Sequence, residues 1–344
     1  MAPPNRRDIE FPTLDGTTLR GWFYPTGQNA PSIILVHGLA CLKEWYFDTL
    51  AEYFQSRGVS VLLYDHRNFG ASDGTPRHEI NPNLQQSDVH DAVTYLLSLP
   101  EQVDPAKLAV LGYSYGSAHC VHTGTLDRRV KAVVSLATFT NGEWILNWTH
   151  PNRDAWDPRI FADRIARVSG SEPEYIRVAP EVGEDMQEAE KSSFMPTPDG
   201  AEFYSRMRRE VTPQWENKLT LQSVFWVRGY QMESALPALA PTPWLMLVDE
   251  QSGETYRSVW DISTGPKEWA VIPGAHFAVV QGDALVKTFE LSLDFLKRHL
   301  GIRIIRIKVP SSNSIVSISR SHSKGVNDNQ SARHSRSFGY PYKL

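Results

Sequence analysis

Residues 107–124 read KLAVLGYSYGSAHCVHTG, and this stretch decides the fold class. The apolar run 108–111 predicts a buried strand, and the residues after Gly116 predict the start of a helix. Between them, the pattern Gly-x-Ser-x-Gly surrounds Ser114. A nucleophilic serine at such a turn takes a strained backbone conformation, and larger neighbours two positions away would clash with the strand and helix. The context therefore predicts a nucleophile elbow, and an ordinary glycine-rich connection is the alternative.

Strands and helices alternate through the first 140 residues. The apolar run that ends at Gly38 suits a strand buried on both faces, and Asp15-Gly16 between two alternating runs is a hairpin signal. This alternation predicts the α/β class, with a mostly parallel central sheet and helices on both faces. The patterns predict further strands at 31–38, 59–70, 130–139 and 242–248, and helices at 44–58, 82–100 and 283–301.

The alternation breaks at residues 141–225, which are rich in Trp and charge, have helical spacing and show no clear strand pattern. We therefore expect an α/β core at 1–140 and 226–300, with a helical cap inserted at 141–225. Residues 301–344 are rich in Ser, Arg and Asn and poor in aliphatic side chains. That composition predicts a basic, disordered tail.

Charge and cysteine content narrow the class of protein. The net charge is −4, and the +7 balance of residues 301–344 leaves about −11 for residues 1–300, which gives no argument for nucleic-acid binding. Two cysteines make no disulfide framework. There is no secretory apolar segment and no run of about 18 apolar residues. We expect a cytoplasmic chain without a membrane span, metal ion or cofactor.

His276 is the expected catalytic base. It lies in VIPGAHFAV (271–279), after a short apolar run and before the last predicted helix, which is the usual chain position of a base that serves a serine. His119 and His122 follow Ser114 on the same helix and are expected to be packing or surface groups. His66 is expected to fix a loop.

Two backbone N–H groups are expected to stabilise a developing oxyanion. His37-Gly38 ends the strand at 31–38, and the turn after it presents the N–H of Leu39. The N–H of Tyr115 follows the candidate nucleophile directly. In this interpretation His37 is structural, and an ordinary strand-end turn is the alternative.

The acid that should orient the histidine is uncertain in the stretch PTPWLMLVDEQSGETY (241–256). Glu250 is the first choice, because its longer side chain extends its reach. Asp249 is second, as a residue that could still belong to the strand, and Glu254 is third. Glu143, after the preceding strand, is another possibility. The remaining alternative is that all of these acids are solvated loop charges.

Five blocks, at 34–54, 58–104, 111–117, 213–247 and 265–282, together resemble the α/β hydrolases of fungal secondary metabolism, and YDHRNFGASDG (64–74) is the most diagnostic part. The group they resemble is the polyketide transferase and thiohydrolase family, over about residues 10–300. The resemblance implies an α/β-hydrolase fold, with Ser114 as nucleophile and His276 as base. The family pattern places an Asp near position 252, where this chain has Ser252.

The resemblance also implies a substrate class: a polyketide acyl chain held as a thioester on the carrier domain of a polyketide synthase. The cap would cover the serine, and its aromatic side chains would line an apolar acyl pocket. The alternative is that these side chains form the cap's own core. The candidates are Trp144, Trp148, Phe203 and Trp215, together with Trp156 and Phe194.

Three functions are compatible with these residues. The favoured one is a serine-dependent acyl hydrolase or acyltransferase acting on a thioester or ester through an acyl-Ser114 intermediate. The second is a general carboxylesterase or peptidase built from the same residues. The third is a binding protein that has kept the fold and lost turnover, which the absence of an Asp at position 252 favours.

Overall fold

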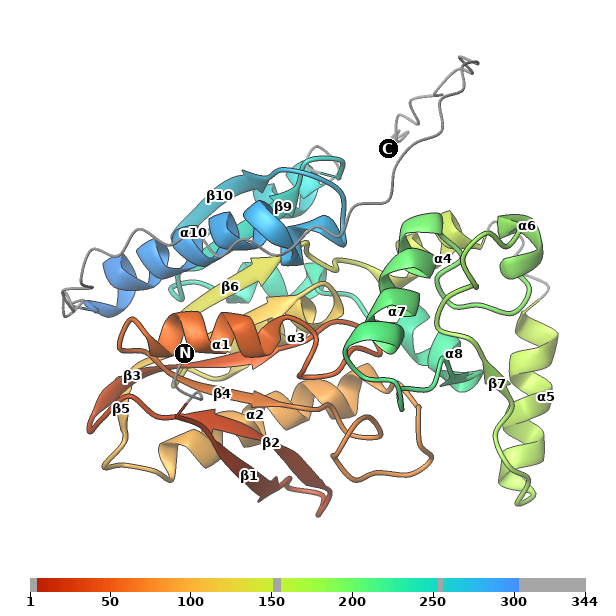
Figure 1. The fold of residues 1–344 in the computed structure, drawn as a ribbon, viewed down its shortest axis with the longest axis horizontal. Helices are drawn as coiled ribbons and strands as arrows, with labels where there is room; N and C mark the ends of the chain where they lie inside the picture. Colours follow the sequence, from red (N-terminus) through yellow and green to blue (C-terminus); the bar gives the residue numbers. More distant parts are fainter. Residues whose placement is uncertain (1–4, 151–155, 253–255, 303–344) are drawn as a thin grey trace, which may run out of the picture. The chain divides into compact units, whose positions relative to one another are not determined.

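Eight strands form one mixed sheet in the computed structural model, which describes residues 5–150, 156–252 and 256–302 (Figure 1). The strand order is β1-β2-β4-β3-β5-β6-β9-β10. The first two pairings, β1 with β2 and β2 with β4, are antiparallel, and the pairings from β4 to β10 are parallel. The predicted mostly parallel sheet and the hairpin at Asp15-Gly16 are confirmed. The strands are β1 (Arg7–Pro12), β2 (Thr18–Tyr24), β3 (Ala30–Val36), β4 (Ser60–Tyr64), β5 (Val103–Tyr113), β6 (Ala132–Leu136), β9 (Trp244–Asp249) and β10 (Lys267–Ile272).

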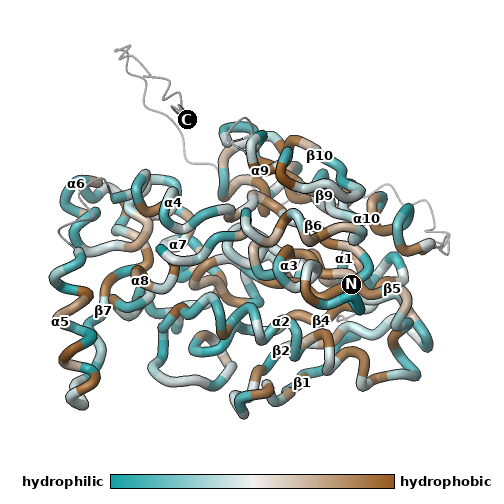
Figure 2. Tube along the Cα trace, turned by 180° about the vertical axis from the view of Figure 1, so that it is seen from behind, coloured by the Kyte–Doolittle hydropathy of each residue, from teal (hydrophilic) through white to brown (hydrophobic). Residues whose placement is uncertain are grey.

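Helices cover both faces of this sheet. α1 (Phe47–Gln55) packs against α10 (Gly282–Leu300), and α2 (Pro82–Leu97) packs against α3 (Tyr115–Leu126). Every residue of β4 and β6 is buried, as expected for inner strands of a parallel sheet. Figure 2 shows hydrophobic residues concentrated along the central strands and hydrophilic residues around α6 (Met186–Ala189).

The segment between β6 and β9 is mainly helical, but it is not free of strands. Its remaining helices are α4 (Gly142–Thr149), α5 (Asp157–Val168), α7 (Pro198–Glu210) and α8 (Gln222–Arg228). Two short strands, β7 (Tyr175–Ile176) and β8 (Leu219–Thr220), pair antiparallel with each other. The expectation that 141–225 holds no strand is therefore wrong. Strands of two residues are too short to leave an alternating pattern in the sequence. A 3₁₀ turn (Glu233–Ala238) and α9 (Arg257–Ile262) flank β9.

The first helix begins later than its sequence pattern predicts. A helix was expected over 44–58, but α1 begins at Phe47 because Tyr46 has a positive φ of 68°. A non-glycine residue rarely takes this left-handed conformation. As a result, residues 39–46 form a loop after β3 instead of the first turn of the helix. This loop carries Leu39, one of the two expected oxyanion donors.

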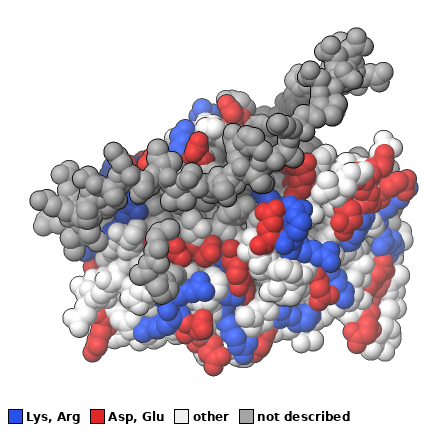
Figure 3. Space-filling model, in the orientation of Figure 1, with Lys and Arg blue, Asp and Glu red and all other residues white. Residues whose placement is uncertain are grey.

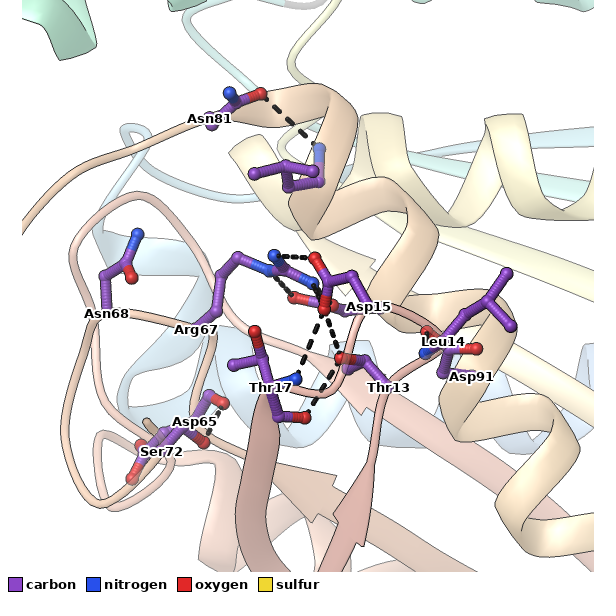
Figure 4. A network of polar contacts seen from close by, with 12 residues as sticks. Thr13, Leu14, Asp15, Thr17, Asp65, Arg67, Asn68, Ser72, Asn81 and Asp91 are labelled. Carbon is purple, nitrogen blue, oxygen red and sulfur yellow. Dashed lines mark hydrogen bonds and ion pairs between the residues drawn. The ribbon is translucent and has the colours of Figure 1, made fainter. Parts of the chain in front are cut away.

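The loop after β4 is fixed by an ion-pair network around the buried Arg67 (Figure 4). Arg67 contacts Asp15 in the β1–β2 turn, with Nη1 to Oδ2 at 2.7 Å, and Asp88 in α2, with Nε to Oδ2 at 2.8 Å. Arg67 lowers the pKa of Asp15 well below its usual value. Burial raises the pKa of Asp88 to about 6, against the opposing effect of Arg67. The YDHRNFGASDG block is therefore structural, as predicted for His66 and its neighbours.

On the face shown in Figure 3, basic and acidic side chains of the described residues are interspersed. No described helix combines the length and the hydrophobicity that crossing a bilayer requires. The predicted basic tail lies outside the described residues from position 303 onward.

Candidate active site

Ser114 lies at the sharp turn between β5 and α3. Its φ of 50° and ψ of −120° are the strained conformation expected of a nucleophile elbow. The two flanking glycines are required there by the packing. A Cβ on Gly112 would lie 2.2 Å from the carbonyl oxygen of Gly116, and one on Gly116 would lie 2.3 Å from that of Val36. The elbow therefore directs the serine side chain away from the sheet and toward groups that other loops contribute.

His276 contacts this serine directly. Its Nε2 lies 2.9 Å from Oγ of Ser114, within hydrogen-bonding distance. The loop that carries the histidine is fixed to the elbow, because the Tyr113 hydroxyl donates to the carbonyl oxygen of His276 at 3.2 Å. Burial lowers the pKa of His276 below its usual value of 6.5, and the negative charges of Asp249 and Asp199 oppose that shift. A neutral imidazole in this position can accept the serine proton.

Asp249 is the last residue of β9 and pairs with Ile272 at the end of β10, four residues before His276. Its side chain is fully buried. Oδ1 accepts a hydrogen bond from the backbone N–H of Ser252 at 2.9 Å. Within the described ranges, Oδ2 is buried and has no hydrogen-bond partner. The carboxylate therefore has an oxygen available in the same region as the imidazole whose pKa it raises.

Glu250, the first choice from the sequence, is exposed. Its Oε2 accepts from the backbone N–H of Gly274 at 3.3 Å, and its own N–H donates to the carbonyl oxygen of Ile272 at 3.0 Å. These contacts hold the start of the histidine loop against the end of β9. They place Glu250 beside that loop and not beside the imidazole.

The other candidate acids lie elsewhere. Glu143 is in the first turn of α4. It borders a cavity of about 530 Å³ that Trp226 and Tyr230 also line. Glu254 lies outside the described residues. Asp199, which the sequence reasoning did not consider, begins the first turn of α7, is exposed and acts on the pKa of His276.

The two expected oxyanion donors border the elbow. Tyr115 is the first residue of α3, where a backbone N–H has no partner within its own helix. Leu39 follows the His37-Gly38 turn at the end of β3. His37 is fully buried, its Nδ1 lies 3.1 Å from the carbonyl oxygen of Gly38, and its Nε2 accepts from the backbone N–H of His66. Burial lowers the pKa of His37 to about 4, so this neutral ring is a structural brace for the turn.

Comparison with known proteins identifies the family. The general model of the alpha/beta hydrolase fold matches residues 31–164. A polyketide transferase of Stachybotrys chlorohalonatus is 32% identical over 314 residues, which are 87% of this chain and 99% of the relative. A thiohydrolase of Eupenicillium brefeldianum is 30% identical over 314 residues, 88% of this chain and 96% of the relative. The crystal structure of the α/β hydrolase GrgF from a Penicillium species is 30% identical and superposes with a TM-score of 0.74, covering 86% of this chain and 99% of GrgF.

This chain belongs to the polyketide transferase and thiohydrolase family of α/β hydrolases. It is therefore an enzyme of the hydrolase and transferase type. The resemblance to this family that the sequence blocks indicated is confirmed.

Side chains from the segment between β6 and β9, the expected cap, contact residues 39–46, which we call the oxyanion loop after its expected donor Leu39. The Tyr204 hydroxyl donates to the carbonyl oxygen of Leu39 at 2.7 Å, and Trp215 Nε1 donates to that of Ala40 at 3.0 Å. Phe203 stacks on Phe277, next to the histidine, with ring centroids 4.5 Å apart. Helix α7 therefore contacts both the oxyanion loop and the histidine loop.

The aromatic residues expected to line an acyl pocket occupy different environments. Phe203 and Trp215 are buried where the cap meets the core, and Phe203 also lines a cavity described below. Trp144 is half-buried, and Trp148 is 55% exposed. Trp156 and Phe194 are buried within the cap.

Two bracing contacts were not predicted from the sequence. The carboxylate of Asp65, at the end of β4, accepts hydrogen bonds from the backbone N–H of Lys43 at 3.0 Å and from Nζ of Lys43 at 2.6 Å. These bonds anchor the oxyanion loop to the sheet. Tyr204 anchors the same loop from the cap. Neither contact leaves a local signal, because its partners lie 22 and 165 positions apart in the chain.

Proposed function

We propose that this enzyme is a serine-dependent acyl hydrolase or acyltransferase that works through an acyl-Ser114 intermediate. The observation that carries the proposal is the 2.9 Å contact between Nε2 of His276 and Oγ of Ser114, made at a strained elbow. A serine hydroxyl is a weak nucleophile until an adjacent base takes its proton. The lowered pKa of His276 keeps that base neutral near pH 7.

The first half of the reaction forms the acyl-enzyme. Oγ of Ser114 bonds to the carbonyl carbon of a thioester as its proton passes to Nε2 of His276. The oxyanion is stabilised by the N–H groups of Leu39 and Tyr115. Collapse of the tetrahedral intermediate breaks the C–S bond, and the imidazolium returns the proton to the leaving thiolate. The protonation states of enzyme and products then balance.

The second half releases the acyl chain. Water or an alcohol attacks the acyl-Ser114 carbonyl, giving its proton to His276, and the ester bond to Oγ breaks as the proton returns to Ser114. Water gives a hydrolase and an alcohol gives a transferase.

Asp249 is our candidate for the acid that stabilises the imidazolium, in preference to Glu250. Its burial, its unpartnered Oδ2 among the described atoms and its effect on the pKa of His276 support this choice. Catalytic hydrogen bonds are often long before substrate binds and tighten in the complex. An acid at position 249 removes the argument for a binding protein without turnover, since that argument depended on the missing Asp.

The names of the relatives support the substrate class. They are called polyketide transferases and thiohydrolases, which favours a polyketide acyl thioester, carried on a synthase carrier domain, as acyl donor. A carboxylesterase would show the opposite preference. Rapid turnover of short p-nitrophenyl esters without turnover of acyl thioesters would favour that function.

Covalent labelling tests the nucleophile. A fluorophosphonate probe should modify the folded protein at Ser114, and the Ser114→Ala variant should remain unlabelled. A neighbouring hydroxyl, Ser117, provides the matched control, and Ser117→Ala should still be labelled. Folded wild-type protein that the probe does not modify would refute the catalytic proposal.

A further inference from the structure

A cavity of about 420 Å³ opens beside the histidine loop. Ala275 and Phe277, the two neighbours of His276, line one part of it. Asp199, Phe203 and Arg206 line the wall that α7 contributes. The cavity therefore begins next to the candidate base and extends along the cap helix.

Two arginines of α7 line the cavity, and Arg206 has no carboxylate partner among the described residues, whereas Arg209 pairs with Glu210. The side chain is half-buried, and its Nε is buried without a hydrogen-bond partner. Across the described part of the chain, no hydrogen bond or ion pair to Arg206 is present. Four other arginines between residues 141 and 225 pair with a carboxylate, namely Arg159, Arg167, Arg177 and Arg209, whereas the described Arg164 and Arg208 do not.

Arg206 lines the cavity and has no carboxylate partner in the described ranges, so its guanidinium group is available to an anion bound there. The planar guanidinium matches a phosphate or carboxylate with two parallel hydrogen bonds, and such charge-assisted bonds are stronger than neutral ones.

The position of Arg206 along α7 restricts which anion fits. Asp199 and Arg206 are seven residues apart, so they share a helix face and lie about 10 Å apart along its axis. Of these two residues, Asp199 is the one whose negative charge acts to raise the pKa of His276. The Asp199 carboxylate repels an anion there and leaves the Arg206 end for it, while Glu202 lies about one turn from each of them. The bound group must therefore carry its negative charge at a distance from its reacting carbonyl.

A phosphopantetheine thioester meets this requirement. In it, a neutral arm of two amide-linked units separates the thioester from the phosphate. We propose that Arg206 binds the phosphate of a phosphopantetheine thioester and that the cavity holds the arm that delivers the thioester to Ser114. This inference rests on the proposed acyl-transfer function. Acyl-coenzyme A and an acylated carrier domain share this chemistry.

The test compares two thioesters that differ only in the phosphate: hexanoyl-pantetheine and hexanoyl-phosphopantetheine. The measured quantity is the ratio of their kcat/KM values. For the wild-type enzyme we expect a preference of about 10-fold or more for the phosphorylated substrate, as one charge-assisted contact provides. In Arg206→Gln the ratio should fall close to one. In Arg208→Gln, an exposed arginine on the same helix that does not line the cavity, it should be unchanged.

Two further measurements separate the possible outcomes. Thermal unfolding of both variants shows whether they are folded. The same variants assayed with hexanoyl-coenzyme A and a hexanoylated carrier domain show which source of the phosphate depends on Arg206. A wild-type ratio near one, or a ratio unchanged in Arg206→Gln, would overturn this inference while leaving the acyl-transfer proposal intact. Failure to turn over any of the thioesters would instead refute the proposed function.

Discussion

Asp249 and Glu250 are adjacent in the chain, but their carboxylates lie in opposite environments. Asp249 is fully buried and acts on the pKa of His276, whereas Glu250 is exposed and accepts a hydrogen bond from the N–H of Gly274. The difference follows from where the strand ends: Asp249 is the last residue of β9, which is buried throughout, and Glu250 begins the exposed turn after it. One acid can therefore orient the base while the next fixes the loop that carries it.

The first prediction distinguishes these two acids. Asp249→Asn removes the charge that would stabilise the imidazolium, and kcat should fall by roughly 10³- to 10⁴-fold, as in the serine proteases whose acid has been changed in this way. Glu250→Gln removes an exposed charge and keeps an oxygen that can accept from the N–H of Gly274, so it should cost less than about 10-fold. Steady-state kinetics with an acyl thioester measures both.

Asp199→Asn is the matched control for charge. Asp199 also raises the pKa of His276, but it is exposed and solvent screens it. We expect a loss of kcat below about 10-fold. If Glu250→Gln or Asp199→Asn lowered kcat as much as Asp249→Asn does, the assignment of Asp249 would be contradicted, and the residue with that effect would be the acid.

The second prediction concerns pH. His276 acts as a base only when neutral, and burial lowers its pKa below 6.5. The value of kcat/KM should therefore rise with pH, reach half its maximum below pH 6.5 and remain level through neutrality. Asp249 opposes the shift, so Asp249→Asn should move the midpoint to a still lower pH. A pH profile with its midpoint above 6.5, or one that shifts upward in Asp249→Asn, would contradict this assignment.

The third prediction tests the contact between cap and oxyanion loop. Tyr204→Phe leaves the buried carbonyl oxygen of Leu39 without its donor at 2.7 Å. The free energy of unfolding should fall by about 1–2 kcal/mol, and kcat should fall more than KM rises, because the loop holds an oxyanion donor. Chemical denaturation and steady-state kinetics measure these effects.

Tyr53→Phe is the control for loss of a hydroxyl. Tyr53 is partly buried on α1, and in the described structure its hydroxyl makes no hydrogen bond. Both stability and kcat should stay close to wild type. Equal effects of the two substitutions would show that the Tyr204 contact does not position the loop.

The fourth prediction concerns the elbow. Gly116→Ala would place a Cβ 2.3 Å from the backbone carbonyl oxygen of Val36, which cannot move without disturbing β3. We expect a loss of roughly 3 kcal/mol or more in the free energy of unfolding. A Cβ at Gly229 would lie 3.8 Å from the carbonyl oxygen of Trp226, an ordinary contact, so Gly229→Ala should change stability by less than about 1 kcal/mol. Similar stabilities of the two variants would mean that the elbow tolerates a side chain.

The sequence predicted the elements whose residues repeat with a clear period. The strands around Ser114 and the helix that ends at Gly301 agree with their patterns, because burial on one or two faces sets those patterns. The start of α1 was missed, since the positive φ of Tyr46 depends on packing around the oxyanion loop. The strands β7 and β8 were missed because two residues have no period.

Some residues of the site were predicted and others were not, because only some of them stand in a local sequence pattern. Ser114 and His276 stand in motifs with a fixed chain order, and the structure brings them together. The preference between Asp249 and Glu250 depends on where β9 ends, and its pairing with β10 extends it to Asp249. Tyr204 and Arg206 lie in an ordinary helical pattern, where only the tertiary structure shows what each side chain faces.

The central claim is that Ser114 carries the acyl chain. Intact-protein mass spectrometry within the first turnovers on hexanoyl-pantetheine, followed by peptide mapping, tests it most directly. We predict a single hexanoyl adduct on the peptide that contains Ser114, absent from Ser114→Ala and accumulating in variants with slowed deacylation. Turnover of the thioester with no adduct on Ser114, or with undiminished activity in Ser114→Ala, would contradict the account.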